Sequence, residues 1–303
     1  MLQSRYYFEL QPPAWLSHSI EVFWCQKLSE HAFFIPQGVF DLLLHSRPIS
    51  FSKIDDQLSI KQVPAGTSIL GQQISAYTLY SKHPQWIFGV RLKPFSFLKQ
   101  QFMSSLEVKN TIESITQLLS HSGYLNDVLP LLTQLNENHI NIQMQPIIEK
   151  ITPWLHCQFI ANLLPIYCQF IANDYVISER LRAETNAILN ARGDIKISDM
   201  CEKFSISKVT LRQHFLDNIG LLPKELCKIW RLNNFLLHSQ SATQTLTESA
   251  INAGYFDQAH LNREFKSLLG QTPKRYLNSA EAHLNQGFQA AINNRFIGKY
   301  DPF

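Results

Sequence analysis

Two stretches near the C-terminal end carry arginine, glutamine and histidine at helical spacing around an apolar stripe. In the first, over about residues 208–217, Leu211 and Phe215 lie four residues apart and share one helix face. Val209, Arg212 and Gln213 project from the other face. Arginine can bond guanine through two hydrogen bonds, glutamine can do so with adenine, and valine can contact a thymine methyl group. The alternative for Arg212 is a phosphate contact or plain solvation.

The second stretch repeats this arrangement over about residues 258–269. With Leu261 and Phe265 turned inward, the outward residues are Gln258, Ala259, His260, Asn262 and Arg263. The alternative for His260 is a neutral, exposed histidine that bonds only a phosphate. Six residues at or near helix starts and flanking turns are candidates for phosphate contacts: Ser207, Lys208, Lys224, Lys266, Lys274 and Arg275. The alternative for each of them, held equally open, is a solvated position on the surface.

The elements that position these residues are repeated at an offset of about 50 residues. Leu211, Phe215, Gly220, Pro223 and Lys224 match Leu261, Phe265, Gly270, Pro273 and Lys274. Each glycine suits the left-handed end of a helix, and each proline suits the first turn of the next. Ahead of each copy lies a shorter helix, over 197–204 and 246–253, followed by a tight turn and a good N-cap, Ser207 or Asp257. A short helix, a turn and a capped second helix make a helix-turn-helix unit. The second unit has one more residue in its turn.

This part of the chain, from about Arg182 to Leu277, resembles the DNA-binding domain of the AraC/XylS family of transcription regulators. The resemblance rests on Ser207–Leu211, Gly220–Lys224, Arg231-Leu232 and above all the string from Gly254 to Lys266 with Gly270–Tyr276. Ser205 departs from the pattern, because the family often has glycine there.

The resemblance implies double-stranded DNA as partner, with two recognition helices in adjacent major-groove segments and Val209, Arg212, Gln213, Gln258, Ala259, His260 and Arg263 facing the bases. It further implies RNA polymerase as a partner and favours an activator, although the sequence does not fix the sign of regulation. A homodimer and a small-molecule effector in the N-terminal region are further expectations.

The sequence pattern of the N-terminal region predicts a β-rich domain. Short β-rich runs, at 6–10, 20–24, 39–45, 75–80 and 86–92, are separated by polar or Pro/Gly turns. They predict a small antiparallel barrel or sandwich. Segments 34–42, 70–72 and 89–94 resemble the N-terminal domain of one AraC subgroup. Asp41 and Arg91 are charged residues inside strand-like runs, and they are expected to pair with each other, or alternatively with a ligand.

Between the two domains the apolar period becomes helical, from Phe95 to Ala191. Positions 108, 112, 115, 118 and 119 recur three or four apart. The hexapeptide Cys-Gln-Phe-Ile-Ala-Asn occurs at 157–162 and again at 168–173, an offset that presents the same side of a helix, and Pro165 is expected to bend or break that helix. Its copies are either packing contacts or a dimerisation helix.

The fold class expected is α+β: a β-rich, barrel-like domain (1–94), a helical linker (95–177), an all-α tandem helix-turn-helix domain (178–279) and a tail (280–303). Residues 178–279 hold 14 Lys or Arg against 10 Asp or Glu, a net +4 (14 − 10), whereas residues 1–177 hold 11 against 12. Positive charge is therefore placed where phosphates would be neutralised.

Composition and motifs exclude several other classes. The five cysteines form no CxxC pair, no His-x-His occurs, and no nucleophile elbow, P-loop or metalloprotease motif appears. We therefore expect no metal, no cofactor and no catalysis. Without a signal-peptide pattern or a span long enough for a bilayer, a cytoplasmic protein that does not enter membranes is expected. The alternative hypothesis for the tandem domain is an adaptor that uses it to bind another protein.

Overall fold

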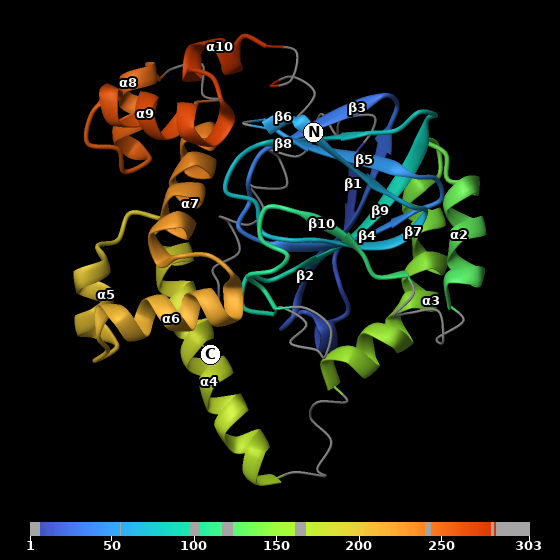
Figure 1. The fold of residues 1–303 in the computed structure, drawn as a ribbon, viewed down its shortest axis with the longest axis horizontal. Helices are drawn as coiled ribbons and strands as arrows, with labels where there is room; N and C mark the ends of the chain where they lie inside the picture. The colour runs from blue at the N-terminus through green and yellow to red at the C-terminus, as the bar shows by residue number, and fades with distance from the viewer. Residues whose placement is uncertain are drawn as a thin grey trace.

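The computed structural model describes residues 7–54, 56–96, 104–116, 124–160, 168–239, 244–279 and 282. Its N-terminal part is built of strands and its C-terminal part of helices, as the expected α+β class requires (Figure 1). Within these residues no helix is both long enough and apolar enough to cross a bilayer.

In the part of the chain that the structure describes, ten strands form two antiparallel sheets. They are β1 (Tyr7–Leu10), β2 (Ile20–Leu28), β3 (His31–Phe34), β4 (Phe40–His45), β5 (Ile49–Lys53), β6 (Asp56–Val63), β7 (Gly66–Leu70), β8 (Tyr77–Tyr80), β9 (Gln85–Leu92) and β10 (Ile112–Ser114), with a 3₁₀ turn η1 (Ala14–Leu16) after β1. The six-stranded sheet has the order β1-β2-β9-β4-β7-β10, and the four-stranded sheet has the order β3-β8-β5-β6. The sheets do not close into a barrel, so a sandwich describes the region better.

The six-stranded sheet is covered on both faces. Trp24 and Leu43 pack in one apolar cluster with residues of the other sheet such as Phe51, whereas the alternate residues Phe23 and Leu42 pack in a second cluster with two helices. These helices are α2 (Tyr124–Gln134) and α3 (Ile140–Ile160), on the right in Figure 1. Since both faces are covered, β4 and β9 are buried along their whole length. This explains their nearly continuous apolar sequence.

Two charged residues inside these strands pair as expected. Asp41 lies opposite Arg91 in the β4–β9 ladder, and Nε of Arg91 is 3.2 Å from Oδ1 of Asp41. The indole Nε1 of Trp24 donates to the same carboxylate oxygen at 2.8 Å. Burial opposes the charge on Arg91, but Asp41 and other acidic neighbours raise its pKa above the ordinary value. The pair is thus a satisfied part of the core.

The helix that the apolar period indicated over residues 108–119 is wrong for nearly all of its described part, because residues 108–110 form a turn and only residue 116 is helical. Residues 112–114 form β10, which pairs antiparallel with β7. The strand is three residues long, too short for alternation to be visible in the sequence. Without it, β7 would be the edge of the sheet, with unpaired backbone groups. The pairing is therefore decided by a distant strand; residues 117–119 lie outside those described.

The two copies of the hexapeptide fall on different helices. The first copy begins in α3, which ends at Ile160, and the second begins α4 (Cys168–Asn190). Residues 161–167, which separate these two helices in the sequence and include Pro165, lie outside the described residues. The expected boundary between residues 177 and 178 falls inside α4.

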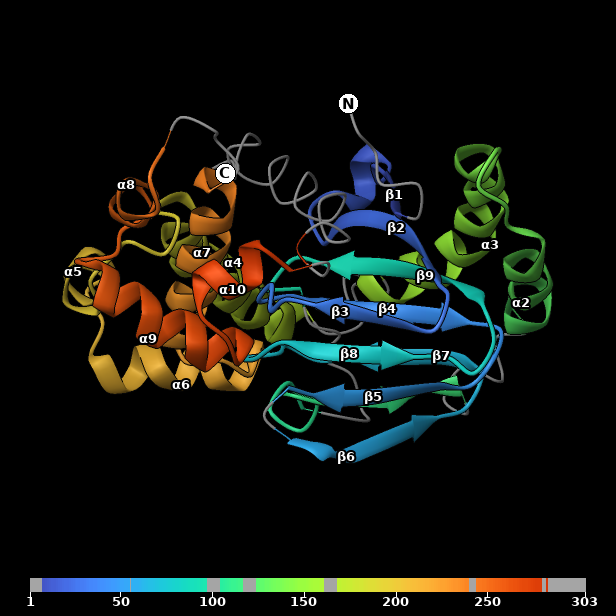
Figure 2. The same ribbon diagram turned by 90° about the horizontal axis from the view of Figure 1, so that it is seen from above.

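The C-terminal helices form a compact group beside the sheets (Figures 1 and 2). They are α5 (Ile197–Lys203), α6 (Lys208–Ile219), α7 (Pro223–His238), α8 (Leu246–Asn252), α9 (Gln258–Leu269) and α10 (Pro273–Leu277). Leu211, Phe215 and Trp230 belong to an apolar cluster of this group.

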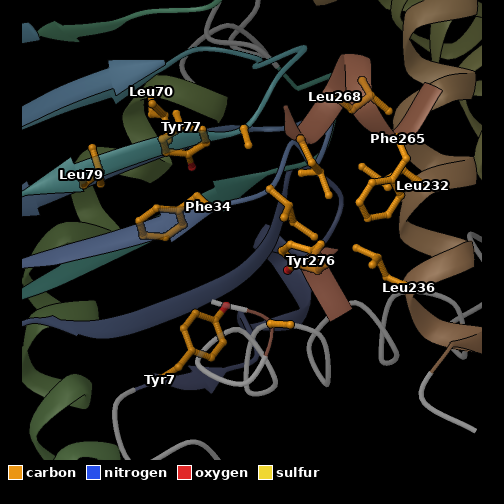
Figure 3. Close-up of a cluster of buried hydrophobic side chains, with 14 of the residues drawn as sticks. Tyr7, Phe34, Leu70, Tyr77, Leu79, Leu232, Leu236, Phe265, Leu268 and Tyr276 are labelled. Carbon is orange, nitrogen blue, oxygen red and sulfur yellow. The ribbon is translucent and has the colours of Figure 1, made fainter. Parts of the chain in front are cut away.

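The second half of the group shares its core with the sheets. Leu261 and Phe265 belong to the same cluster as Phe34 and Tyr77 of the four-stranded sheet. Figure 3 shows that sheet facing Phe265 and Tyr276 across the cluster. The second unit therefore has no separate apolar core, whereas the fully buried members of the first unit's cluster all come from residues 181–230.

Candidate nucleic-acid interface

The first unit is α5 followed by α6. Ser207 caps α6 as expected, because its Oγ accepts from the backbone N–H of Thr210 at 3.0 Å. Gly220 ends the helix with φ +78°, a conformation that glycine adopts without strain. Ser205 in the preceding turn also has a positive φ, +48°. This is why the corresponding family position is often glycine.

The outer face of α6 carries the three candidates for base contacts. Leu211 and Phe215 are fully buried, and this turns Val209, Arg212 and Gln213 into solvent. Val209 is 77% exposed, although it is apolar. Gln213 Nε2 donates to Asp217 Oδ1 at 2.7 Å, a surface hydrogen bond on the same helix. The face is accessible at the N-terminal half of the helix, the part that enters the groove in helix-turn-helix proteins.

The second unit is α8 followed by α9. Thr245 and Glu248 form a capping box at the start of α8, and Asp257 caps α9 by accepting from the backbone N–H of His260 at 2.6 Å. Gly270 ends α9 with φ +70°, matching Gly220. The same local rules thus position both recognition helices.

The extra residue in the second turn changes what that turn exposes. Tyr255 is buried, whereas Phe256 is 90% exposed. In the first unit the residue before the cap, Ile206, is half-buried against the core. Tyr255 therefore occupies the core position, and Phe256 is placed in solvent directly before the cap of α9.

Most of the expected outward residues of α9 are exposed, namely Gln258, Ala259, Asn262 and Arg263. His260 differs, because it is half-buried and held by three neighbours. Its Nε2 lies 3.3 Å from Glu264 Oε1, its Nδ1 accepts from the N–H of Phe256 at 3.4 Å, and its ring meets Tyr255 edge-on at 5.3 Å. The structure thus assigns His260 packing contacts within its own unit.

Sequence reasoning missed Glu264, which links the second unit to α7. The Glu264 carboxylate accepts from Nε and Nη2 of Arg231 at 3.3 and 3.2 Å. The guanidinium also lies over the Tyr255 ring at 5.5 Å. In the sequence, Arg231 is distinguished only by its place in the family resemblance. Its spacing of 33 residues from Glu264 gives no local signal that the two residues meet.

An acidic residue was missed in the first unit as well. Glu184 on α4 is fully buried, and its carboxylate lies 3.1 Å from Arg180 Nε and 3.4 Å from Nδ1 of His214 on α6. It therefore ties the first recognition helix to α4.

All six candidates for phosphate contacts are exposed. They are Ser207, Lys208, Lys224, Lys266, Lys274 and Arg275. Lys274 and Arg275 lie in the first turn of α10, whose N-cap is Thr272, and Lys224 lies in the first turn of α7. Among the ion pairs of the described residues, none includes one of these five cations. They are available to an external anion.

No feature of the described residues points to metal or thiol chemistry at this interface. Within that part of the chain, no group of three or more His, Cys, Asp or Glu is arranged to hold a metal ion. Cys227 on α7 is buried, and burial raises the pKa of its thiol to about 11.

Comparison with known proteins identifies the C-terminal part. A helix-turn-helix domain family matches residues 200–279. This chain carries an AraC-type helix-turn-helix domain. The AraC-type domain coincides with the two capped units described above. A domain family of unknown function, DUF6597, matches residues 8–110, the sheet region.

Curated relatives match about a quarter of the chain. The chain is 31% identical over 85 residues to the transcriptional regulator MxiE of Shigella flexneri, which covers 28% of this chain and 40% of that protein. It is 29% identical over 77 residues to the invasion protein InvF of Salmonella typhi, with 25% and 36% covered. The matches therefore span less than half the length of these relatives.

The solved structures to which the chain is similar include those of ToxT from Vibrio cholerae. One crystal structure is 11% identical, with a TM-score of 0.40 and coverage of 90% of this chain and 98% of that chain. A form of ToxT bound to an unsaturated fatty acid is 14% identical, with a TM-score of 0.39 and coverage of 84% and 93%.

Proposed function

We propose that this chain is a transcription regulator that binds specific sites on double-stranded DNA through α6 and α9. The observation that carries the proposal is the equivalence of the two helices. Each begins at a capped turn, ends at a left-handed glycine, and presents polar, exposed side chains at its N-terminal half. Two such helices joined by α7 suit two adjacent major-groove segments.

The residues proposed to contact bases are Val209, Arg212 and Gln213 on α6 and Gln258, Ala259, Asn262 and Arg263 on α9. His260 was in the same expected set, and we keep it as a contact that would require its bond to Glu264 to open. Positioning on the phosphates is proposed for Ser207, Lys208, Lys224, Lys266, Lys274 and Arg275. Since Ser207 Oγ already accepts from Thr210 N–H, its phosphate contact would use the hydroxyl proton.

One experiment tests the interface. Genome-wide binding with the purified protein yields operators, on which Arg212→Ala and Lys274→Ala are compared with wild type. Arg212→Ala should weaken specific binding by about 1–3 kcal/mol and leave random DNA nearly unaffected. Lys274→Ala should weaken binding to all sequences alike and lower the salt slope by about one unit.

The two variants act as controls for each other. Equal losses on operator and random DNA would make Arg212 a phosphate contact, and an unchanged salt slope would remove Lys274 from the interface. A wild-type protein that binds neither DNA, but captures a protein through the tandem domain, would instead favour the adaptor function.

The N-terminal region is proposed to regulate this domain by dimerisation, by a small-molecule effector, or both, and RNA polymerase is proposed as the partner at promoters. Arg91 is not proposed as an effector ligand, because Asp41 already holds it. The fragment of residues 178–279 is proposed to bind DNA less tightly than the full chain. Its second unit would lose the apolar contacts with the sheets, so its stability must be measured beside its dissociation constant.

A further inference from the structure

The N-terminal region extends to β10, which belongs to its six-stranded sheet, and its segment 104–110 reaches the C-terminal end of the first recognition helix. The last carbonyl groups of a helix have no partner within that helix. The hydroxyl group of Ser105 lies 3.1 Å from both the Leu216 and the Asp217 carbonyl oxygens, in the last turn of α6. A Cβ atom added at Gly220 would meet the backbone oxygen of Ser105 at 2.4 Å. Ser105 therefore packs directly on this helix end.

It also reaches the corresponding end of the second recognition helix. The backbone N–H of Ala76 donates to the Leu268 carbonyl oxygen in the last turn of α9 at 2.7 Å. A Cβ atom added at Gly270 would meet Ile54 at 3.1 Å. Gly220 and Gly270 are equivalent positions of the sequence repeat. The N-terminal region thus contacts both units at the same structural position.

The two contact points are fixed to one another. The Asn110 side chain accepts from the N–H of Ile74 at 2.9 Å, and the N–H of Asn110 donates to the Gln72 carbonyl oxygen at 3.0 Å. Segment 104–110, which carries Ser105, is therefore bonded to segment 72–76, which carries Ala76. The pairing of β10 with β7 continues this connection.

The contacts leave the opposite ends of both helices accessible. Val209 and Arg212 on α6, and Gln258 and Ala259 on α9, are all exposed. The bonded segments 72–76 and 104–110 therefore contact both helices at their C-terminal ends, while the N-terminal halves of the helices remain available to DNA.

We propose that the N-terminal region sets the separation of α6 and α9, so that the full-length regulator selects operators by the spacing between their two half-sites. This inference rests on the proposed function. Ser105 and Ile54 are positioning residues, because they act through the helices and touch no DNA. α7 joins the two units directly, through its apolar contacts with both and through the Arg231–Glu264 pair.

The test measures affinity for operators whose half-sites are moved apart or together by one base pair. The protein is the full chain carrying Ser105→Ala and Ile54→Ala together. The ratio of affinities between the best and the altered spacing should fall about five- to tenfold, the effect of losing one hydrogen bond and part of one apolar contact. The affinity for the best spacing should change less. The matched control is Leu106→Ala with Ile60→Ala, since both side chains are exposed and lie near the positioning residues in sequence.

Each outcome decides the inference. A ratio equal to that of wild type overturns it, as does an equal loss of affinity at every spacing, which would reflect only lower stability. The melting temperature of each variant identifies this second case. Failure of wild type to bind any operator would overturn the proposed function itself, a result distinct from binding that ignores spacing.

Discussion

The Arg231–Glu264 pair is expected to hold the second recognition helix on α7, and its contribution can be worked out from its surroundings. The Glu264 side chain is 9% exposed and that of Arg231 is 13% exposed, so solvent screens the pair only weakly. Two hydrogen bonds, at 3.2 and 3.3 Å, join the charges. Charged hydrogen bonds contribute about 1.5–3 kcal/mol, and removing one partner of a buried pair costs about 3–5 kcal/mol.

The perturbation is a double-mutant cycle with Glu264→Gln and Arg231→Met. Glutamine keeps the shape of the side chain but removes its charge, and methionine keeps most of the apolar stem. Each single variant should lower the free energy of unfolding by about 2–3 kcal/mol, and the coupling energy should be about 2 kcal/mol. Urea denaturation of the full chain measures all four species.

An exposed ion pair of the same type provides the control. Arg182 and Glu179 lie 3.3 Å apart on α4, with side chains 32% and 51% exposed. The same substitutions there should give a coupling below about 0.5 kcal/mol. A coupling energy that small at Arg231–Glu264 would contradict the prediction, because it would mean that the two residues are close without stabilising each other. Loss of operator affinity should accompany the loss of stability only if the pair positions α9.

Three further predictions concern the caps, the second turn and acid stability. Ser207→Ala and Asp257→Ala should each lower the free energy of unfolding by about 1 kcal/mol, since each leaves a helix N–H without its side-chain acceptor. An unchanged melting temperature would contradict a stabilising role for these caps. Tyr255→Ala should destabilise by about 3–5 kcal/mol, whereas Phe256→Ala, at a 90% exposed residue, should stay within about 0.5 kcal/mol; equal effects would contradict the assignment of core and solvent positions in this turn. Burial lowers the pKa of His45, whose ring atoms lie 2.9 Å from the Arg47 carbonyl oxygen and from Ser68 Oγ. The unfolded chain therefore binds a proton that the folded chain does not, and stability should fall as the pH drops below about 6.5. Because burial also lowers the pKa of His18 and His238, the measured quantity is the difference from His45→Gln, which should lose less stability between pH 7 and pH 5; parallel curves would contradict it.

Features that depend on neighbours within a few turns of the chain could be predicted from the residues alone. The caps at Ser207 and Asp257, the left-handed ends at Gly220 and Gly270, and the exposed faces of α6 and α9 follow from local hydrogen bonds and helical spacing. These rules predicted α9 at its observed bounds and the start of α6 at Lys208. The buried pair Asp41–Arg91 was also predicted, because two charges in apolar strands need partners.

Contacts between segments far apart in the sequence could not be predicted, because they depend on how the elements pack. Residues 112–114 become a strand because β7 offers an edge, although their apolar period is helical. Glu264 is turned onto Arg231, 33 residues away on α7, through a contact that no local spacing encodes. Ser105 lies 111 residues from the α6 carbonyl that it contacts, and Ala76 lies far from α9 in sequence. The last carbonyl groups of a helix lack partners within the helix. The N–H of Gly220, next in sequence after α6, supplies a donor to Leu216, whereas tertiary packing brings Ser105 to Asp217 and Ala76 to Leu268.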